Sequence, residues 1–393
     1  KSDWKVIVLV LSRPVKDMES RASTYPMLPV DEALEIVLQE AKSLTIGTRT
    51  VALHEALGRT LAEDLLSALD LPQFPASMKD GYCLKVDELE KTEGKTYNVV
   101  DTVLAGRDVS DLPETIPVGH VYKIMTGAPI PKSCNTVVMV ENTTLLDSDA
   151  EGNEISISIQ TPEIHEGRDV RQVGSDIKEG EVILKRGETI RATEVGLLSS
   201  CGISSVQIFH TPAIGVMSTG DEVKDPSNTS SLLPGQIFDA NRPMLMAMLR
   251  QFDSALTIKD CGIVEDESKV LFNAIQSAFD SVDILITSGG VSMGEVDLVK
   301  KWMEDNGKVH FGRVLMKPGK PLTFATLERD GKKKLMFATP GNPVSSYVTS
   351  VLFVLPCIRV LLGKENAKHP VVEAKLKHSI RLDPQRPEYH RAT

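Results

Sequence analysis

Three short segments of the chain place glycine beside hydroxyl or amide side chains, a composition that suits anion binding. They are residues 218–222 (STGDE), 287–294 (TSGGVSMG) and 340–345 (PGNPVS). Glycine lets the backbone approach a phosphate closely, and free N–H groups at a following helix start bind the anion. One such segment alone is more simply explained as a strand-to-helix turn. Three of them in one predicted sheet favour an anionic ligand.

A basic turn at residues 317–321 is the second chemical feature. Lys317 and Lys320 flank a Pro-Gly pair in residues 317–321 (KPGKP), and Arg313 precedes them. The prolines restrict the backbone, so the two ammonium groups are held in place. A solvated surface turn would explain the lysines better than it explains the two prolines. We therefore interpret the turn as a binding element for phosphate, pyrophosphate or an oxyanion.

Two carboxylates stand close to these segments in the sequence. Asp266 follows the apolar residues 262–264, and Asp297 follows the second glycine segment at a predicted helix start. Carboxylates repel a phosphate unless a divalent cation lies between them, so the pair suggests Mg²⁺. Helix capping is the competing explanation. Asp80, in residues 78–82 (MKDGY), is typical of a hairpin turn, and the eight histidines show no metal-ligand spacing.

The elements that would position these residues follow an α/β pattern from residue 206 to residue 363. Apolar stretches at 213–217 and 282–287 alternate with amphipathic helices such as 241–252, where Asn241 is a candidate N-cap. This alternation predicts a parallel sheet, which binds ligands at the carboxyl ends of its strands. Upstream, an apolar stripe predicts a helix after Pro29, and residues 66–161 alternate short β-prone pieces with turns.

Composition excludes several classes of protein. The 393 residues exceed what one hydrophobic core usually serves, and the net charge of −10 argues against nucleic-acid and membrane-surface binding. The five cysteines are scattered without a CxxC pair, which fits the reducing cytoplasm and indicates neither disulfides nor zinc. The apolar run at residues 6–11 is too short to span a membrane.

Five segments together resemble the molybdopterin molybdotransferase family, in the form of the gephyrin E domain. They are residues 75–82 (PASMKDGY), 123–129 (KIMTGAP), 287–294 with Asp297, 316–321 (MKPGKP) and 340–345. The similarity runs in family order from about Pro29 to the last residue. Each segment is moderately specific, and the set argues strongly against a chance match.

The resemblance implies a multidomain α/β plus β protein. Residues 1–25 are expected to be a linker remnant, and residues 26–65 with 164–205 a split, elongated dimerisation domain. A β-rich inserted domain at 66–163, a parallel α/β molybdopterin-binding-like domain at 206–363 and the start of a truncated C-terminal β-barrel at 364–393 complete the expected order. It also implies a cytoplasmic homodimer whose active cleft is shared between subunits.

The resemblance further implies an enzyme of molybdenum cofactor biosynthesis that inserts molybdate into adenylated molybdopterin and releases AMP. Catalytic roles fall by motif matching on Asp80, Glu222, Asp266, Asp297 and Lys317, with Asp266 and Asp297 holding Mg²⁺. The adenylated pterin would contact Thr126, Asp176, Ser288, Gly289, Gly290, Ser292, Gly294, Arg313 and Lys320. Molybdate would contact Lys320, Ser345 and Arg391.

Two other functions share parts of this pattern. A gephyrin-like scaffold would cluster membrane receptors through a peptide groove, with or without the enzyme activity. An adenylyltransferase acting one step earlier shares the α/β domain but does not require the β-rich module, and such a domain could also precede this chain. Asp80, Asp297, Lys317 and Lys320 favour the transferase, because a pure scaffold has no physical need for them.

Overall fold

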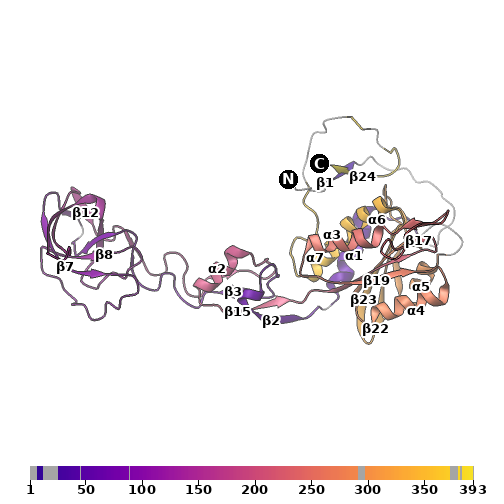
Figure 1. Cartoon of the computed structure of the whole chain (residues 1–393), viewed down its shortest axis with the longest axis horizontal. Coiled ribbons are helices and arrows are strands. Elements are labelled where there is room, and N and C mark those ends of the chain that lie inside the picture. Colours follow the sequence, from indigo (N-terminus) through magenta and orange to yellow (C-terminus); the bar gives the residue numbers. More distant parts are fainter. Residues whose placement is uncertain are drawn as a thin grey trace. The chain divides into compact units, whose positions relative to one another are not determined.

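The computed structural model describes residues 7–11, 25–44, 46–87, 89–290, 297–371, 379–380 and 383–392, which form two compact units (Figure 1). The α/β unit comprises Lys1–Glu63, Arg186–Gly196 and Ser204–Thr393. The β-rich unit comprises Asp64–Lys185 and Leu197–Ile203. Each unit is described by itself.

The α/β unit is built on a six-stranded sheet with a parallel centre, as the sequence predicts. In spatial order its strands are β19 (Thr257–Val264), β16 (Ala213–Thr219), β20 (Ile284–Ser288), β23 (Lys332–Thr339), β22 (Thr323–Arg329) and β21 (Lys308–Phe311). The first four are parallel, whereas β22 and β21 pair antiparallel. Because β16, β20 and β23 are neighbours that run the same way, their carboxyl ends meet at one edge of the sheet.

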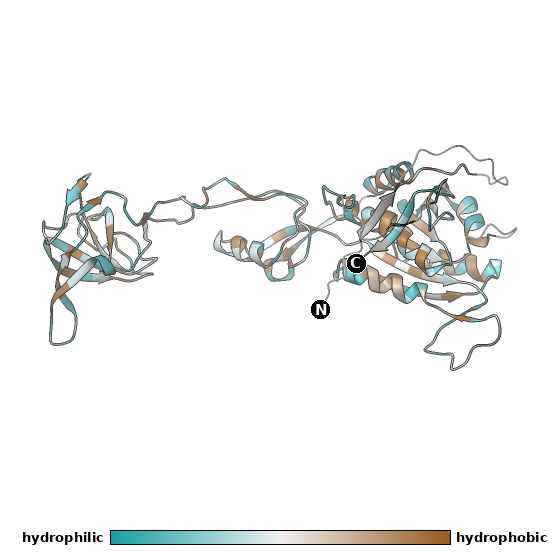
Figure 2. Ribbon diagram, turned by 90° about the horizontal axis from the view of Figure 1, so that it is seen from above, coloured by the Kyte–Doolittle hydropathy of each residue, from teal (hydrophilic) through white to brown (hydrophobic). Residues whose placement is uncertain are grey.

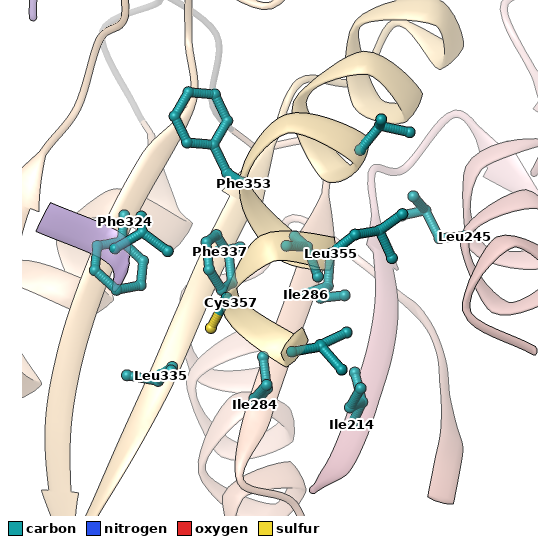
Figure 3. Close-up of a cluster of buried hydrophobic side chains, with 14 of the residues drawn as sticks. Ile214, Leu245, Ile284, Ile286, Phe324, Leu335, Phe337, Phe353, Leu355 and Cys357 are labelled. Atoms are coloured by element: carbon teal, nitrogen blue, oxygen red, sulfur yellow. The ribbon is translucent and has the colours of Figure 1, made fainter. Parts of the chain in front are cut away.

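Helices cover both faces of this sheet, and the side-chain alternation of the strands explains why. Ile284 and Ile286 pack into the cluster formed with α1 (Val30–Lys42), α3 (Asn241–Phe252) and α7 (Leu355–Leu361), as Figure 3 shows for part of it. Leu285, between them, packs against α4 (Ser268–Phe279) and α5 (Leu298–Asn306) on the opposite face. Strands buried on both faces need continuous apolar sequence, which is brown in Figure 2.

One long helical segment lies across the sheet on the α1 side. It comprises α6 (Pro343–Thr349), a π-helical turn η3 (Ser350–Val354) and α7. Pro356 has no amide hydrogen to donate, so a regular α-helical pattern cannot continue through it. By length and composition Pro343–Leu361 could cross a membrane, but two thirds of it is buried within the chain, as in the core helix of a globular domain.

The chain start and the chain end both join the α/β unit. Helix α1 packs on α7 and on the sheet, although the sequence grouped it with residues 164–205. Strand β1 (Ile7–Leu11), in the segment expected to be a linker, pairs antiparallel with β24 (Glu388–Ala392). Strands β2 (Thr48–Ala52) and β15 (Ser205–Phe209), the turn η1 (Leu53–Glu55) and the two-stranded β17 (Val223–Lys224) with β18 (Ile237–Phe238) complete this unit.

The β-rich unit consists mainly of short strands joined by turns, as the sequence predicts from residue 66. Its main sheet has the order β10 (Thr143–Ser148), β11 (Glu154–Ile159), β7 (Thr96–Val103), β8 (His120–Ile124), β5 (Gly81–Leu84) and β9 (Thr136–Met139). Smaller ladders join β3 (Leu65–Leu66) to β14 (Val182–Leu184), β4 (Ala76–Ser77) to β13 (Val170–Arg171) and β6 (Leu89–Lys91) to β12 (Glu163–His165). The turn η2 (Val140–Asn142) follows β9, and helix α2 (Ala192–Ser200) crosses from one unit to the other in sequence.

Candidate functional site

The three glycine-containing segments lie at the carboxyl ends of β16, β20 and β23, as predicted. Gly289 has a φ of 93°, and a Cβ atom there would lie 2.5 Å from the carbonyl oxygen of Thr219. Only glycine fits this close approach between the turns after β16 and β20. A Cβ on Gly341 would lie 3.7 Å from the Cα of Gly289, so the turn after β23 lies beside them. Ser288 ends β20 at this point, whereas Ser292 and Gly294 lie outside the described residues.

Asn241 connects two of these turns, a role that its sequence position does not reveal. The predicted helix over residues 241–252 is confirmed, but Asn241 is its first residue and makes no capping bond with the helix. Its side-chain Nδ2 instead donates to Ser288 Oγ at 2.5 Å and to the Gly341 carbonyl oxygen at 2.8 Å. Residues about 50 and 100 positions apart are thereby joined, and no local sequence signal could have identified the pairing.

Carboxylates gather at the same edge of the sheet. The backbone N–H of Asp266 donates to Asp221 Oδ1 at 3.0 Å. Burial, followed by the negative charges of Asp221 and Glu222, raises the pKa of Asp266 above its ordinary value. The structure therefore brings the predicted Glu222 and Asp266 together and adds Asp221, which the sequence analysis did not single out.

Asp297 is the most strongly shifted of these carboxyls. Burial is the main reason that its pKa is raised to about 6, and the charges of Glu304 and Asp266 act in the same direction. Asp297 also caps α5, because its Oδ1 accepts from the Lys300 backbone N–H at 2.9 Å. The Asp297 side chain therefore both caps α5 and interacts electrostatically with Asp266.

The carboxylates fit a cation that is only partly held by protein. Among the residues that the structure describes, no three His, Cys, Asp or Glu side chains form a group that could hold a metal ion. The negative charge of Asp266 nevertheless contributes to the raised pKa of Asp297, so the two carboxylates interact electrostatically. Mg²⁺ commonly uses one or two carboxylates and takes its other ligands from substrate phosphates and water.

The basic turn lies between the two ends of the chain. Leu28 and Val314 form one β-bridge, and Lys317 and Glu388 form another. The Lys317 ammonium contacts Glu388 at 2.7 Å and Asp383 at 3.4 Å. The Arg313 guanidinium donates to the carbonyl oxygen of Tyr25 at 2.9 Å. Two of the three predicted cations are thus occupied by chain segments far away in sequence.

Lys320 differs from Lys317, since it forms no ion pair within the described part of the chain. The turn packs on α6, because a Cβ on Gly319 would lie 2.6 Å from Thr349 Cγ2. Ser345 lies in the first turn of the same helix, where Asn342 accepts from its backbone N–H at 3.1 Å. Arg391 belongs to β24, paired with Val8 through the backbone, and its side chain is outside the described residues.

The remaining predicted residues lie in the β-rich unit. Asp80 Oδ1 accepts from the backbone N–H of Thr126 at 2.6 Å and from its hydroxyl at 2.9 Å. These two hydrogen bonds, the backbone one first, hold the pKa of Asp80 below its ordinary value. Asp176 instead forms an ion pair with Arg171, whose Nε donates at 3.0 Å. The Asp-Gly signal had suggested only a hairpin, so the Thr126 partner is what gives Asp80 a fixed orientation.

A pocket on the α/β unit lies away from the glycine turns. It has a volume of about 830 Å³ and is lined by α1, by the end of α7 and by the residues that follow, including Glu35, Arg359, Lys364 and Lys368. The residues of the glycine turns do not line this pocket. We identify the candidate site by its chemistry and not by its volume, because phosphates bind to exposed backbone turns without a deep cavity.

The sequence and the fold of this chain are similar to those of known proteins. A family model described as the MoeA N-terminal region (domain I and II) matches residues 28–202, and a second, described as a probable molybdopterin binding domain, matches residues 215–360. A crystal structure of a molybdopterin biosynthesis MoeA protein from Pyrococcus horikoshii aligns with a TM-score of 0.71 and 29% identity over 87% of this chain and 81% of that one. The fold, with its mixed α/β sheets, is therefore shared with that protein.

Two curated relatives are similar over most of the chain. Molybdopterin molybdenumtransferase of Haemophilus influenzae is 34% identical over 370 residues, which cover 93% of this chain and 86% of that protein. Gephyrin of Dictyostelium discoideum is 38% identical over 411 residues, covering 95% of this chain. The match spans only 56% of that gephyrin, so the chain corresponds to little more than half of its length.

Proposed function

Because the chain belongs to the molybdopterin molybdenumtransferase family, we propose that it inserts molybdate into adenylated molybdopterin and releases AMP. The observation that carries this proposal is the meeting of three glycine turns at the carboxyl ends of β16, β20 and β23. The carboxylates at the same edge and the basic turn, which packs on α6, supply the charges that a pyrophosphate substrate and an oxyanion require.

In this proposal the glycine turns hold the phosphates of the adenylated pterin. The backbone N–H of Gly289 already donates to the Thr339 carbonyl oxygen at 3.3 Å, so the next N–H, that of Gly290, would donate to a phosphate oxygen. Lys317 would add a positive charge once phosphate competes with its carboxylate partners. Glu222 would orient the water that attacks the pterin-side phosphorus. The P–O bond to AMP would then break, AMP would leave, and the water's proton would pass to solvent. Asp80, held by Thr126, is assigned from the family resemblance to orienting water or metal.

Asp266 and Asp297 would hold Mg²⁺, which when bound neutralises phosphate charge and polarises the phosphoanhydride. Lys320 and Ser345 would seat molybdate, a small dianion that one or two cations and a few hydroxyl or amide donors can hold. Lys320 suits this role because it has no ion-pair partner among the described residues. Arg391 remains a proposed third contact.

Molybdate-dependent release of AMP tests the proposal directly. The chain would be mixed with adenylated molybdopterin and Mg²⁺, molybdate would be titrated, and AMP would be measured by chromatography. We expect AMP to rise with molybdate until it saturates. Release of AMP at the same rate without molybdate would overturn the proposal, and consumption of ATP with release of pyrophosphate would support the adenylyltransferase alternative.

A gephyrin-like scaffolding function is the second candidate, favoured by the similarity to the Dictyostelium gephyrin. It predicts binding of a receptor peptide, and it does not require the carboxylates and glycine turns at the edge of the sheet. A chain that binds peptides but shows no molybdate-dependent AMP release would favour the scaffold over the enzyme. If the chain has both activities and a bound peptide leaves AMP release unchanged, the two activities use different surfaces.

We also propose that the chain acts as a homodimer in the cytoplasm. Large apolar side chains are exposed in the segments expected to dimerise, with Leu57 59% exposed and Val173 and Val182 each 44% exposed. A two-fold dimer would bury such side chains symmetrically where they form a continuous surface. The five cysteines are all free thiols, as expected in a reducing compartment. Sedimentation showing a stable, active monomer would contradict the dimer.

A further inference from the structure

Residues 239–242 (DANR) contact the carboxyl ends of three neighbouring strands from the start of α3. Ser218, in β16, donates through Oγ to Asp239 Oδ1 at 2.9 Å. Asn241 donates to Ser288 at the end of β20 and to the Gly341 carbonyl oxygen just after β23. One short segment therefore links all three strand ends whose turns form the candidate phosphate site.

The segment is itself anchored by charge. Arg242 donates through Nε to Asp239 Oδ2 at 2.9 Å and through Nη2 to Asp225 Oδ2 at 2.6 Å, and its Nη1 contacts Asp260 in β19. A planar guanidinium shared by three carboxylates has little rotational freedom. Asp239 and Asn241, on either side of Ala240, are consequently held in fixed positions relative to the sheet.

Burial makes these hydrogen bonds costly to lose. Ser218 and Ser288 are each 2% exposed, Asp239 is 6% exposed and Asn241 is 8% exposed. A buried polar group that loses its partner is destabilised by the full cost of its desolvation. Removal of the Asn241 amide would leave both the Ser288 hydroxyl and the Gly341 carbonyl without this donor.

The Asn241 side chain is not explained by packing alone. Its Oδ1 is buried and has no hydrogen-bond partner among the described residues. An apolar side chain of similar volume would avoid that cost, so the amide is advantageous only through its two donated bonds. Both bonds end on turns that carry glycine next to a strand end, where the backbone has the most conformational freedom to lose.

We propose that Asn241 is a positioning residue that sets the distance between the turn at Ser288–Gly289 and the turn at Gly341–Asn342. The two turns would then meet the ligand's phosphates at a fixed spacing, without reorganisation on binding. The inference rests on the proposed function for the identity of the ligand. The clamping of the two turns can be measured without any ligand.

Amide hydrogen exchange of Asn241→Ala tests the clamp itself. We expect faster exchange in peptides covering residues 284–290 and 339–346, and unchanged exchange in the β-rich unit. Gln251→Ala is the matched control, because it truncates an exposed amide side chain on the same helix. Unchanged exchange in both turns, or equally faster exchange throughout the α/β unit, would overturn the proposal.

Binding of ADP, measured by calorimetry, tests the consequence for phosphate recognition. We expect Asn241→Ala to weaken ADP binding by roughly tenfold, the scale of one or two buried hydrogen bonds, and to raise KM more than it lowers kcat. Gln251→Ala should bind as the wild type does. Wild-type ADP affinity in Asn241→Ala, together with unchanged KM, would contradict the positioning role. Failure of the wild type itself to bind ADP or to release AMP would instead count against the proposed function.

Asn241→Asp provides a second variant that preserves shape. Its ionised form has no donor for Ser288 or Gly341, whereas its protonated form regains one O–H donor. We therefore expect its ADP affinity relative to the wild type to recover as the pH is lowered through the pKa of the introduced carboxyl. A ratio of affinities that does not change with pH would show that the donated hydrogen bonds do not matter.

Discussion

The ammonium group of Lys317 lies 2.7 Å from a carboxylate oxygen of Glu388, and the backbones of the two residues form a β-bridge. The hydrogen bond to Glu388, then that to Asp383, raises the pKa of Lys317, and the same contact with Lys317 lowers the pKa of Glu388. Both groups therefore stay charged over a wide pH range. The basic turn is tied to the chain end, and part of its positive charge is already neutralised.

Glu388→Gln is expected to loosen residues 383–390 from the basic turn. The amide keeps the shape but removes the charge, so limited proteolysis of this segment at neutral pH should be roughly two- to fivefold faster, the scale of an ion pair with one solvent-exposed partner. Glu365→Gln is the control, because Glu365 is exposed and forms no ion pair in the described part of the chain. Equal cleavage rates in the wild type and Glu388→Gln would mean that backbone pairing alone holds the segment.

Acidification should release the same contact later than an ordinary glutamate would. The folded-state pKa of Glu388 is lowered, so its stabilising contribution is present above the ordinary value and is lost only as the pH falls through the lowered pKa. An NMR titration of the Glu388 carboxyl should therefore show a midpoint below that of a free glutamate. A midpoint at or above the ordinary value would refute the ion pair in solution.

Asp297→Asn is expected to retain the fold and to lose activity by about 10²-fold, the scale of removing one electrostatic contact at a reacting centre. Asparagine keeps the oxygen that caps α5. Because the pKa of Asp297 is raised to about 6, ionising it costs stability as the pH rises from its ordinary value through 6. The variant should consequently melt at a higher temperature than the wild type above pH 6, and the difference should vanish near pH 4.

Adding Mg²⁺ to the same melting experiment shows whether Asp297 is part of a cation site or is only a buried carboxyl. At pH 7.5 the wild type should gain thermal stability with Mg²⁺, whereas Asp297→Asn should gain much less. Asp305→Asn, an exposed carboxylate in the same helix, should behave as the wild type does. An equal response of all three proteins would remove Asp297 from the proposed metal site.

The elements that position the site follow from local sequence, α3 from its amphipathic spacing and β20 from a short continuous apolar run. The helix at α3 and the apolar strand at β20 lie where hydrophobic spacing predicts them. The glycine turns follow the strands because a close approach to a neighbouring turn admits no Cβ, as at Gly289. Parallel strand pairing then places these turns at one edge without further information.

The partners of the site residues do not follow from local sequence. Asn241 with Gly341 and Lys317 with Glu388 are joined only because distant elements pack together. Asp221 was missed for the same reason, since its contact with Asp266 depends on the neighbouring strands β16 and β19. Residue type and spacing predicted which groups carry charge, whereas the pKa of each group depends on burial and neighbours that only the fold supplies.

Lys320→Ala is expected to weaken molybdate saturation more than binding of the adenylated pterin. Lys320 has no ion-pair partner in the described part of the chain, so its charge is available to an oxyanion. The molybdate concentration at half-maximal AMP release should rise by roughly tenfold or more, as expected for a lost charge-assisted hydrogen bond. Lys301→Ala, an exposed lysine on α5, is the control. Equal losses for both substrates would make Lys320 a general phosphate contact.

Thr126→Val tests whether Asp80 must be held in one orientation. The substitution removes the hydroxyl hydrogen bond at 2.9 Å but leaves the backbone N–H bond at 2.6 Å. Because hydrogen bonds from Thr126 hold the pKa of Asp80 down, the pKa should rise part of the way back toward its ordinary value. Asp80 stays ionised at pH 7 in both proteins, so a lower kcat there would reflect lost orientation.

The acid limb of the pH profile should move to higher pH in Thr126→Val. Thr126→Ser should restore both the kcat and the pH profile, and the melting temperature should be unchanged. An NMR titration that finds the same Asp80 pKa in the wild type and Thr126→Val, with equal kcat, would exclude Thr126 from this role.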